Sequence, residues 1–312
     1  MNIAAGVDLN KSALKTFTKN FPEAEAIEGS VRSKTVLKKC AMHLRPIEGP
    51  TMPSLVVSGP PCQGFSVAGP RKATDPRNQI LVAVARAIVK VRPDCALIEN
   101  VSMVLAHKYS SRLKKFKGVL AGAGYHVSSV LLNASEFGVS QKRKRAFFLV
   151  TRKPLKEQKI LALLEAYKIV SSGAQEALKG LPTAIVRPDD YNDENNYGII
   201  ANHIAMQHSK PVIEKIAAIP PGTGPMSYRR LHPERLSNTL ISGHRAPPAH
   251  FQEPRSITVR EAARLQGFPD TYRIYGSFGK QMEQVTNAVP PPLAKAVLQV
   301  LLQLTNIQCP AS

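Results

Sequence analysis

One cysteine stands in a sequence context that suits covalent chemistry. Cys62 lies in Gly59-Pro60-Pro61-Cys62-Gln63-Gly64-Phe65-Ser66, a turn stiffened by two prolines that directly follows the apolar run 55–58. A thiol becomes an effective nucleophile when its surroundings lower its pKa. A single cysteine is more commonly a buried structural residue, so the assignment of Cys62 as a nucleophile depends on what accompanies it.

A carboxyl group is expected beside this thiol. Glu99 and Asn100 end the next apolar run of the sequence, which begins at Cys95. Ligands of parallel sheets gather beyond the carboxyl ends of the strands. Glu99 and Cys62 should therefore project at the same edge of one sheet, which favours a catalytic interpretation over a structural one.

A basic segment supplies a third element. Gln141-Lys142-Arg143-Lys144-Arg145 precedes the apolar run 146–150, and in extended backbone Arg143 and Arg145 point to one face. Two guanidinium groups on one face could hold a phosphate or orient the carboxyl of Glu99. Taken alone, such a segment is more often a solvated basic run.

The elements that must position these residues follow an α/β pattern. Short apolar runs alternate with helical periodicity in the first half of the chain, which predicts a largely parallel sheet covered by helices on both faces. The expected strands are 3–7, 55–58, 95–99, 127–132 and 146–150, and the expected helices are 11–20, 78–91 and 111–121.

The pattern divides the chain into three segments. We predict a catalytic and cofactor-binding domain over 1–151, a less regular recognition region over 152–255, and a segment 256–312 that completes the first domain. The recognition region opens with a helix over 155–167 and contains the Pro- and Gly-rich loop 219–225. Regularity returns with a helix over 258–266. A last helix follows Pro290-Pro291-Pro292, with one apolar face made by Leu293, Val297, Val300, Leu301 and Leu304.

The composition indicates a polyanionic partner. Lys and Arg total 42 against 22 Asp and Glu, a formal charge of +20, which favours nucleic acid through counterion release. Trp is absent, which disfavours a stacking platform for single strands. No apolar run is long enough for a membrane span and no signal peptide is seen, so a cytoplasmic protein is expected. Cys40, Cys95 and Cys309 have no metal-ligand spacing, so no metal site is predicted.

Five ordered blocks together resemble the cytosine-5 DNA methyltransferase family, over nearly the whole chain. The blocks are the Cys62 turn, Glu99-Asn100-Val101, the Gln141–Arg145 segment as Gln-x-Arg-x-Arg, Thr258 to Pro269, and Asn287-Ala288-Val289-Pro290-Pro291. Thr239-Leu240 resembles the signature of the recognition region. The resemblance implies a Rossmann-like methyltransferase sheet that depends on S-adenosylmethionine.

The resemblance also implies roles for the residues. Cys62 would add to C6 of a cytosine flipped out of duplex DNA, Glu99 would bind N3 and the amino group, and Arg143 and Arg145 would position the base and its phosphate. Residues implied to contact DNA are Gln63, Ser66, Gln141 and Thr239. Residues implied to contact the cofactor are Asp8 at the ribose hydroxyls, Leu9 at the adenine, and Ser30, Val31, Pro61, Ile80, Asn287 and Val289.

The chain departs from the family pattern in three places. The family opens with a strand and a Phe-x-Gly-x-Gly-Gly loop, and no such segment is seen here, so we expect the first strand of the sheet to be missing and cofactor binding to be weak. Ser30 replaces an acidic residue, and Thr286 replaces the Gly before Asn287. A late start codon, a fragment or split enzyme, and a degenerate DNA-binding member are the three explanations.

The substrate leaves alternatives open. A related branch that methylates transfer RNA carries Cys-Phe-Thr at the catalytic cysteine, whereas Cys62-Gln63-Gly64 favours DNA. A DNA-binding protein without turnover on the same scaffold is the other alternative. A monomer is expected, with association to the nucleoid if the source is bacterial, and a cognate restriction endonuclease is a further expected partner.

Overall fold

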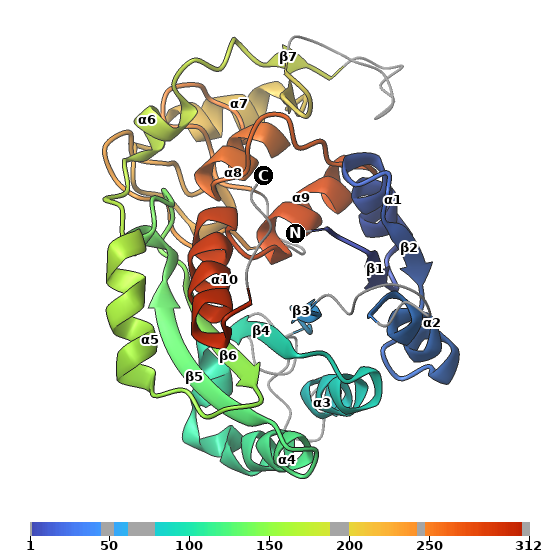
Figure 1. Ribbon diagram of the computed structural model, residues 1–312. Helices are drawn as coiled ribbons and strands as arrows, with labels where there is room; N and C mark the ends of the chain where they lie inside the picture. The colour runs from blue at the N-terminus through green and yellow to red at the C-terminus, as the bar shows by residue number, and fades with distance from the viewer. Residues whose placement is uncertain (1, 45–52, 62–78, 188–199, 242–246, 308–312) are drawn as a thin grey trace.

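The structure is a computed structural model that describes residues 2–44, 53–61, 79–187, 200–241 and 247–307 (Figure 1). The strands are β1 (Ala5–Asp8), β2 (Glu25–Glu28), β3 (Leu55–Ser58), β4 (Cys95–Val101), β5 (His126–Asn133), β6 (Lys144–Thr151), β7 (Ile185–Val186) and β8 (Ile204–Ala205). The helices are α1 (Lys11–Asn20), α2 (Lys34–Leu44), α3 (Ile80–Val91), α4 (Ser110–Ala121), α5 (Glu157–Leu164), α6 (Ala174–Leu178), α7 (Lys210–Ala217), α8 (Val259–Leu265), α9 (Phe278–Asn287) and α10 (Pro291–Thr305).

The main sheet has four strands in the order β3-β4-β6-β5. β3 and β4 are parallel, as predicted, whereas β6 is antiparallel to both β4 and β5. The expectation of a largely parallel sheet is therefore wrong for β6, whereas β3, β4 and β5 run in one direction. The physical reason is the connection between β5 and β6: residues 134–143 hold one short 3₁₀ turn and no crossover helix, and a short link joins strands that run in opposite directions.

The first two strands form a separate parallel pair. Among the described residues β1 pairs only with β2 and β3 pairs only with β4, so the sheet is interrupted between β1 and β3. The strands beside the interruption are less buried than the central ones, and the side chain of Val57 in β3 is 63% exposed. Helices hold the first pair to the rest instead, through contacts of α1 with α9 and of α2 with α3.

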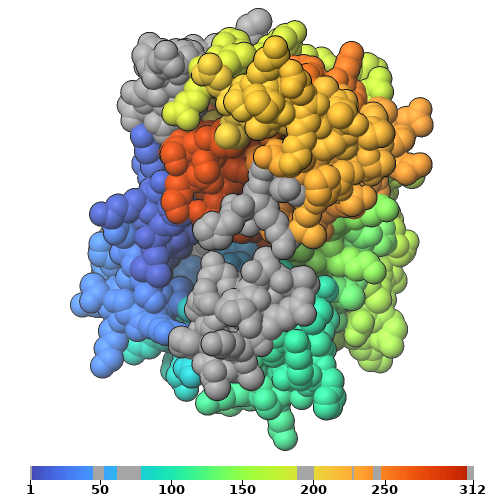
Figure 2. Space-filling view, turned by 180° about the vertical axis from the view of Figure 1, so that it is seen from behind, coloured from blue at the N-terminus to red at the C-terminus, as the bar shows by residue number. Residues whose placement is uncertain are grey.

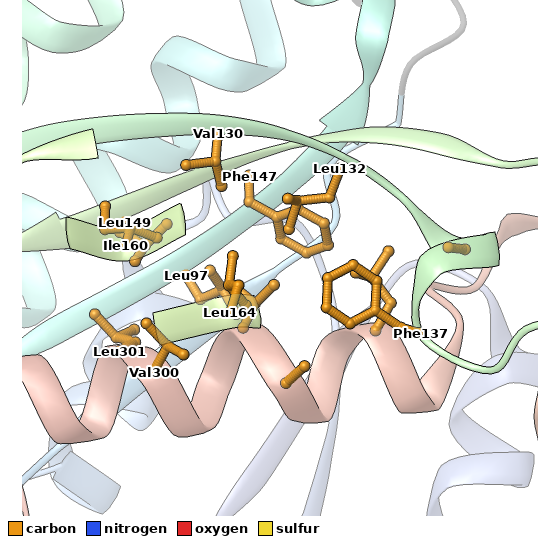
Figure 3. Packing of buried hydrophobic residues seen from close by; sticks show 14 of the residues in the cluster. Leu97, Val130, Leu132, Phe137, Phe147, Leu149, Ile160, Leu164, Val300 and Leu301 are labelled. Carbon is orange, nitrogen blue, oxygen red and sulfur yellow. The ribbon is translucent and has the colours of Figure 1, made fainter. Parts of the chain in front are cut away.

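Two apolar clusters cover the two faces of the main sheet. Alternate residues of β4 point to opposite sides: Ala96 and Ile98 pack with α3 and α4, while Cys95 and Leu97 pack with α5 and α10. Figure 3 shows the second cluster, in which α10 lies along the sheet with Val300 and Leu301 among the packed side chains. Of the predicted apolar face of α10, Leu293, Val297, Val300 and Leu301 are fully buried and Leu304 is partly buried against the same cluster.

A third cluster forms the core of the second lobe. It joins α6 and Leu240 to α8 and α9, so residues 257–285 pack with residues 174–240 rather than with the sheet. The same segment also contacts the first domain, since the backbone N–H groups of Arg273 and Tyr275 donate to the side chains of Asn20 and Thr16 in α1. The boundary at 255 stays a prediction. None of the helices within the described ranges is long and apolar enough to span a lipid bilayer.

Candidate active site

Glu99 lies on β4 at the edge where the turn of Cys62 begins. Its side chain is 12% exposed, and its Oε1 is 2.7 Å from the Nε of Arg145. The other carboxylate oxygen faces Gly59, where an added Cβ would lie 3.7 Å away. The carboxyl group is therefore held against the first residue of the Cys62 turn.

The neighbouring Asn100 ties that turn to the sheet. Its buried Nδ2 donates to the backbone carbonyl of Pro60 at 3.2 Å, and its Oδ1 accepts from the backbone N–H of Val101. Cys62, Gln63 and Ser66 lie outside the described residues, so their predicted roles remain predictions. The first two residues of the turn, Gly59 and Pro60, lie beside Glu99 and Asn100.

Burial sets the protonation of Glu99. Removal from water raises the pKa of this carboxyl above its ordinary value, and the charges of Arg145 and Arg143 oppose the effect without cancelling it. A carboxyl with a raised pKa stays protonated to higher pH than an ordinary glutamate, so Glu99 can act as a hydrogen-bond donor or a proton donor as well as an acceptor.

The two arginines of the basic segment have different partners. Arg145, at the start of β6, pairs with Glu99 and also donates through Nη1 to the carbonyl of Lys144. Arg143 is 1% exposed, and its Nη2 donates to the carbonyls of Thr286 and Ala288 at 2.7 and 3.0 Å. Both guanidinium groups lie close enough to Glu99 to act on its charge. Arg145 thus faces the carboxyl directly, whereas Arg143 joins the sheet to the end of α9.

The predicted DNA contacts Gln141 and Thr239 lie at the junction of the two lobes. Gln141 has no exposed surface, and its side chain is bonded to Gln266 and to the backbone of Leu240. A direct DNA contact by Gln141 does not fit this geometry, because a fully buried amide cannot reach a base or phosphate. Thr239 is partly exposed and donates to the carbonyl of Lys142 at 2.6 Å, so its predicted contact remains a prediction.

The predicted cofactor residues lie at the ends of elements. Asp8 ends β1 and is exposed, and one of its carboxylate oxygens accepts from the backbone N–H of Asn10 at 2.8 Å. Ser30 and Val31 follow β2, and the Ser30 hydroxyl accepts from the backbone N–H of Arg32. The remaining positions are Pro61, Ile80 at the start of α3, and Asn287 and Val289 at the end of α9.

These residue types fit a nucleoside. A carboxylate such as Asp8 accepts hydrogen bonds from ribose hydroxyls, and the side chain of Leu9 is 70% exposed, which leaves apolar surface for an adenine ring. Contacts of α1 with α9, and of α2 with β1 and α3, join the elements that carry the set. Figure 2 shows the N-terminal residues, in blue, at one side of the molecule and the yellow and orange residues of the second lobe above them.

The two cysteines that the structure describes, Cys40 and Cys95, are poor nucleophiles. Cys95 is fully buried, and burial raises the pKa of its thiol to about 12. Cys40 is half-buried, and burial raises its pKa as well. Both fit the expectation of ordinary structural thiols, while Cys309 lies outside the described residues. In the described part of the chain, no three His, Cys, Asp or Glu side chains gather as a metal site.

Gln266 is a buried junction residue that sequence reasoning misses. It has no exposed surface and bonds to Gln141 and to the backbone at the end of α9. The only signal is its place in the block 258–269, where it follows the apolar face of a helix and would ordinarily be taken for a helix-end residue.

Comparison with protein families gives one match over most of the chain. The model of the family described as C-5 cytosine-specific DNA methylase matches residues 1–303. The type II methyltransferase M.DdeI of Desulfomicrobium norvegicum is 30% identical over 298 residues, covering 78% of this chain and 71% of that protein. The type II methyltransferase M1.HphI of Haemophilus parahaemolyticus is 30% identical over 317 residues, covering 96% and 80%.

Solved structures give the same grouping. A prophage-encoded protein of E. coli, assigned as a DNA modification methyltransferase, superposes with a TM-score of 0.78 at 26% identity and covers 98% of this chain and 93% of its own. The Dnmt2 methyltransferase of S. pombe superposes with a TM-score of 0.66 over 98% of this chain and 92% of its own. Its 16% identity supports the fold alone.

Proposed function

The chain belongs to the C-5 cytosine-specific DNA methylase family, and on that premise we propose that it methylates cytosine at C5 in a short duplex DNA sequence through a covalent adduct of Cys62. It is a DNA (cytosine-5-)-methyltransferase that depends on S-adenosylmethionine, of the type II class found in restriction–modification systems. The observation that supports the proposal best is Glu99, a buried carboxyl with a raised pKa, held by Arg145 against the base of the Cys62 turn.

The reaction begins at the thiol. The Cys62 thiolate forms a bond to C6 of the cytosine, and the electrons of the C5–C6 double bond shift so that C5 becomes nucleophilic. When bound, S-adenosylmethionine supplies an electrophilic methyl group on a sulfonium sulfur. Transfer of that group to C5 would break the S–CH3 bond and release S-adenosylhomocysteine. Loss of the C5 proton to water would then restore the C5–C6 double bond and expel the Cys62 thiolate.

Glu99 and Arg145 stabilise the negative charge that develops on the cytosine ring. Addition at C6 pushes electron density onto N3, and a protonated Glu99 can donate to N3 while its other oxygen accepts from the amino group. Arg145, 2.7 Å from this carboxyl, fixes its orientation. The reacting cytosine must leave the base stack to reach these groups, so base flipping is part of the proposal.

On the cofactor side, the chain's own residues bind and orient. Asp8 would accept from the ribose hydroxyls, and Leu9 would cover one face of the adenine, while Asn287 and Val289 close the site from the end of α9. These assignments, the monomeric state, a cytoplasmic and nucleoid-associated location, and a partner endonuclease are proposals drawn from the resemblance.

The experiment is methyl transfer from labelled S-adenosylmethionine to duplex DNA. Cys62→Ser should lower transfer by at least about 10³-fold, because the hydroxyl cannot replace the thiolate, and should leave the affinity for duplex DNA within about twofold. Cys40→Ser is the matched control, a half-buried cysteine outside the site, and should transfer as the native chain does.

Other outcomes identify the alternatives. Transfer in Cys62→Ser at a tenth of the native rate or more excludes the covalent mechanism. DNA binding with no transfer by the native chain identifies a binding protein on this scaffold. Transfer to transfer RNA but not to duplex DNA identifies an RNA methyltransferase.

A further inference from the structure

A chain of buried hydrogen bonds connects the second lobe to the end of α9. Gln266 caps α8, and its side-chain nitrogen donates to the backbone carbonyls of Val285 and Ala288, the latter at 2.8 Å. Its side-chain oxygen accepts from Nε2 of Gln141 at 3.0 Å. Gln141 in turn accepts on its own side-chain oxygen from the backbone N–H of Leu240 at 3.3 Å. Two bonds in series therefore join Leu240 to Gln266, and two further bonds from Gln266 reach the segment 285–288.

The bonding pattern requires a primary amide at position 266. Both N–H groups and the oxygen of Gln266 are used, and the residue has no exposed surface on which water could replace them. A carboxylate of the same length has no donor, and a methionine has neither a strong donor nor a strong acceptor. Substitution therefore leaves buried carbonyls without partners, which is costly in a dry environment.

The segment at the end of α9 is held from two sides. Arg143 reaches it from the sheet, donating to the carbonyls of Thr286 and Ala288. Gln266 reaches it from the second lobe, through Val285 and the same Ala288 carbonyl. The position of this segment thus depends on how the two lobes are docked.

We propose that Gln266 is a positioning residue that couples the docking of the second lobe to the cofactor-side segment 285–289. Leu240 follows Thr239, which lies at the recognition-region signature, and Ala288 lies between Asn287 and Val289. A shift of Leu240 is passed through Gln141 and Gln266 to the backbone that carries those two residues. The consequence for cofactor binding rests on the proposed function, whereas the mechanical link does not.

Amide hydrogen exchange of the 312-residue chain, followed by mass spectrometry, tests the link. Gln141→Met breaks the bonds to Gln266 and Leu240 but touches neither carbonyl at the end of α9. It should nevertheless raise exchange in the peptide that spans 285–289 on the order of tenfold, as loss of a buried hydrogen bond predicts. Gln266→Met should raise it at least as much.

Matched controls separate the link from general destabilisation. Ser237→Ala removes a buried 3.0 Å bond to the Ser140 carbonyl at the same junction, apart from the bonds that link Leu240 to 285–288. Ile160→Ala opens a cavity in the core beneath α5. It serves as a control for a general loss of stability like that expected of Gln141→Met. Neither should change exchange in 285–289. Equal exchange of 285–289 in Gln141→Met and Ser237→Ala would overturn the proposal. Gln141→Ala breaks the same two hydrogen bonds with a smaller side chain and should give the same result even if Gln141→Met misfolds.

The cofactor consequence has its own measurement. Calorimetry with S-adenosylhomocysteine should show about fivefold weaker binding to Gln141→Met than to Ser237→Ala, with KM for the methyl donor raised more than kcat is lowered. If the chain transfers no methyl group at all, the proposed function fails while the exchange result stands. If the native chain transfers methyl groups normally and Gln141→Met does not change exchange in 285–289, the proposed coupling is wrong and the proposed function is unaffected.

Discussion

Glu99 and Arg143 are ionisable side chains largely removed from water within one site, and their partners differ. Glu99 shares a single short bond with Arg145 and keeps its second oxygen toward Gly59, so the carboxyl remains available to a base. Arg143 donates instead to two main-chain carbonyls beyond the sheet. The first arrangement suits proton donation, and the second suits support of a neighbouring segment.

At this scale we predict a pH dependence that Glu99 controls. Because burial raises its pKa, the protonated fraction, and with it the rate of methyl transfer, should fall as pH rises through that raised pKa. Glu99→Gln keeps the size and the hydrogen bonds but has no titrating proton. The variant should be slower by about 10²- to 10³-fold and should lose the decline at high pH.

Single-turnover rates across pH measure this effect. Glu136→Gln, at an exposed carboxylate paired with Lys168, is the control and should follow the native profile. A native rate that does not decline with rising pH, or a Gln variant with the full native profile, contradicts the assignment.

At the scale of elements, α8 is the helix that organises the second lobe. Thr258 and Glu261 form a capping box, in which each side chain bonds the backbone N–H of the other residue. Glu261 also accepts twice from Arg255, which is bonded on its other side to Glu253. Burial alone would raise the pKa of Glu261, but the bonds and charge of Arg255 outweigh it and lower the pKa below its ordinary value.

This network predicts acid sensitivity of the second lobe. Since the folded-state pKa of Glu261 is lowered, its contribution to stability is present above the ordinary carboxyl pKa and is lost as pH falls through the lowered value. Glu261→Gln should reduce the free energy of unfolding by about 3 kcal/mol at neutral pH, as expected for a broken buried pair, and should flatten the loss of stability toward acid pH.

The paired control is Glu253→Gln, which removes the other carboxylate from Arg255. Its side chain is 40% exposed against 3% for Glu261, so solvent screens the pair and the loss should be about 1 kcal/mol or less. Urea unfolding at several pH values measures both variants. Equal losses of unfolding free energy in Glu261→Gln and Glu253→Gln would mean that the capping box and the burial of Glu261 do not add to the stability.

At the scale of the whole molecule, the excess of positive charge is the dominant property. The formal charge of +20 is spread over a chain whose relatives include type II DNA methyltransferases. Neutralising phosphates releases counterions from duplex DNA, which makes affinity fall steeply with salt. Basic side chains at the DNA-facing surface should contribute to this salt dependence of the affinity, and basic side chains elsewhere should not.

We therefore predict that affinity for duplex DNA falls by about 10³-fold between 50 and 200 mM salt, as six phosphate contacts would give. Fluorescence anisotropy of a labelled duplex measures the slope. Lys142 is an exposed lysine whose backbone carbonyl accepts from Thr239. Lys142→Ala should reduce the slope of log affinity against log salt concentration by about one, as the loss of one phosphate contact predicts. Lys114→Ala, on the exposed face of α4 away from the predicted DNA contacts, should leave it unchanged. A native affinity insensitive to salt would remove the electrostatic argument.

Local pattern was enough to place most elements and the principal site residues. The helix at 11–20 and the strand at 55–58 have the predicted bounds, because apolar periodicity and flanking turn residues are local signals. The buried face of α10 and the meeting of Glu99 with Arg145 also follow from spacing along the chain.

Long-range contacts decided the rest. The antiparallel direction of β6 depends on how a short connection turns, and the membership of residues 257–285 in the second core depends on packing between segments far apart in sequence. Gln141 belongs to a basic segment that, as sequence, suggests contact with DNA, yet the fold buries it beneath Gln266 and Leu240. Sequence alone determined which side chains could do the chemistry, since residue type and local spacing are written in it. Tertiary structure decided which of them face the site and which support it, because burial and hydrogen-bond partners arise only when distant segments meet.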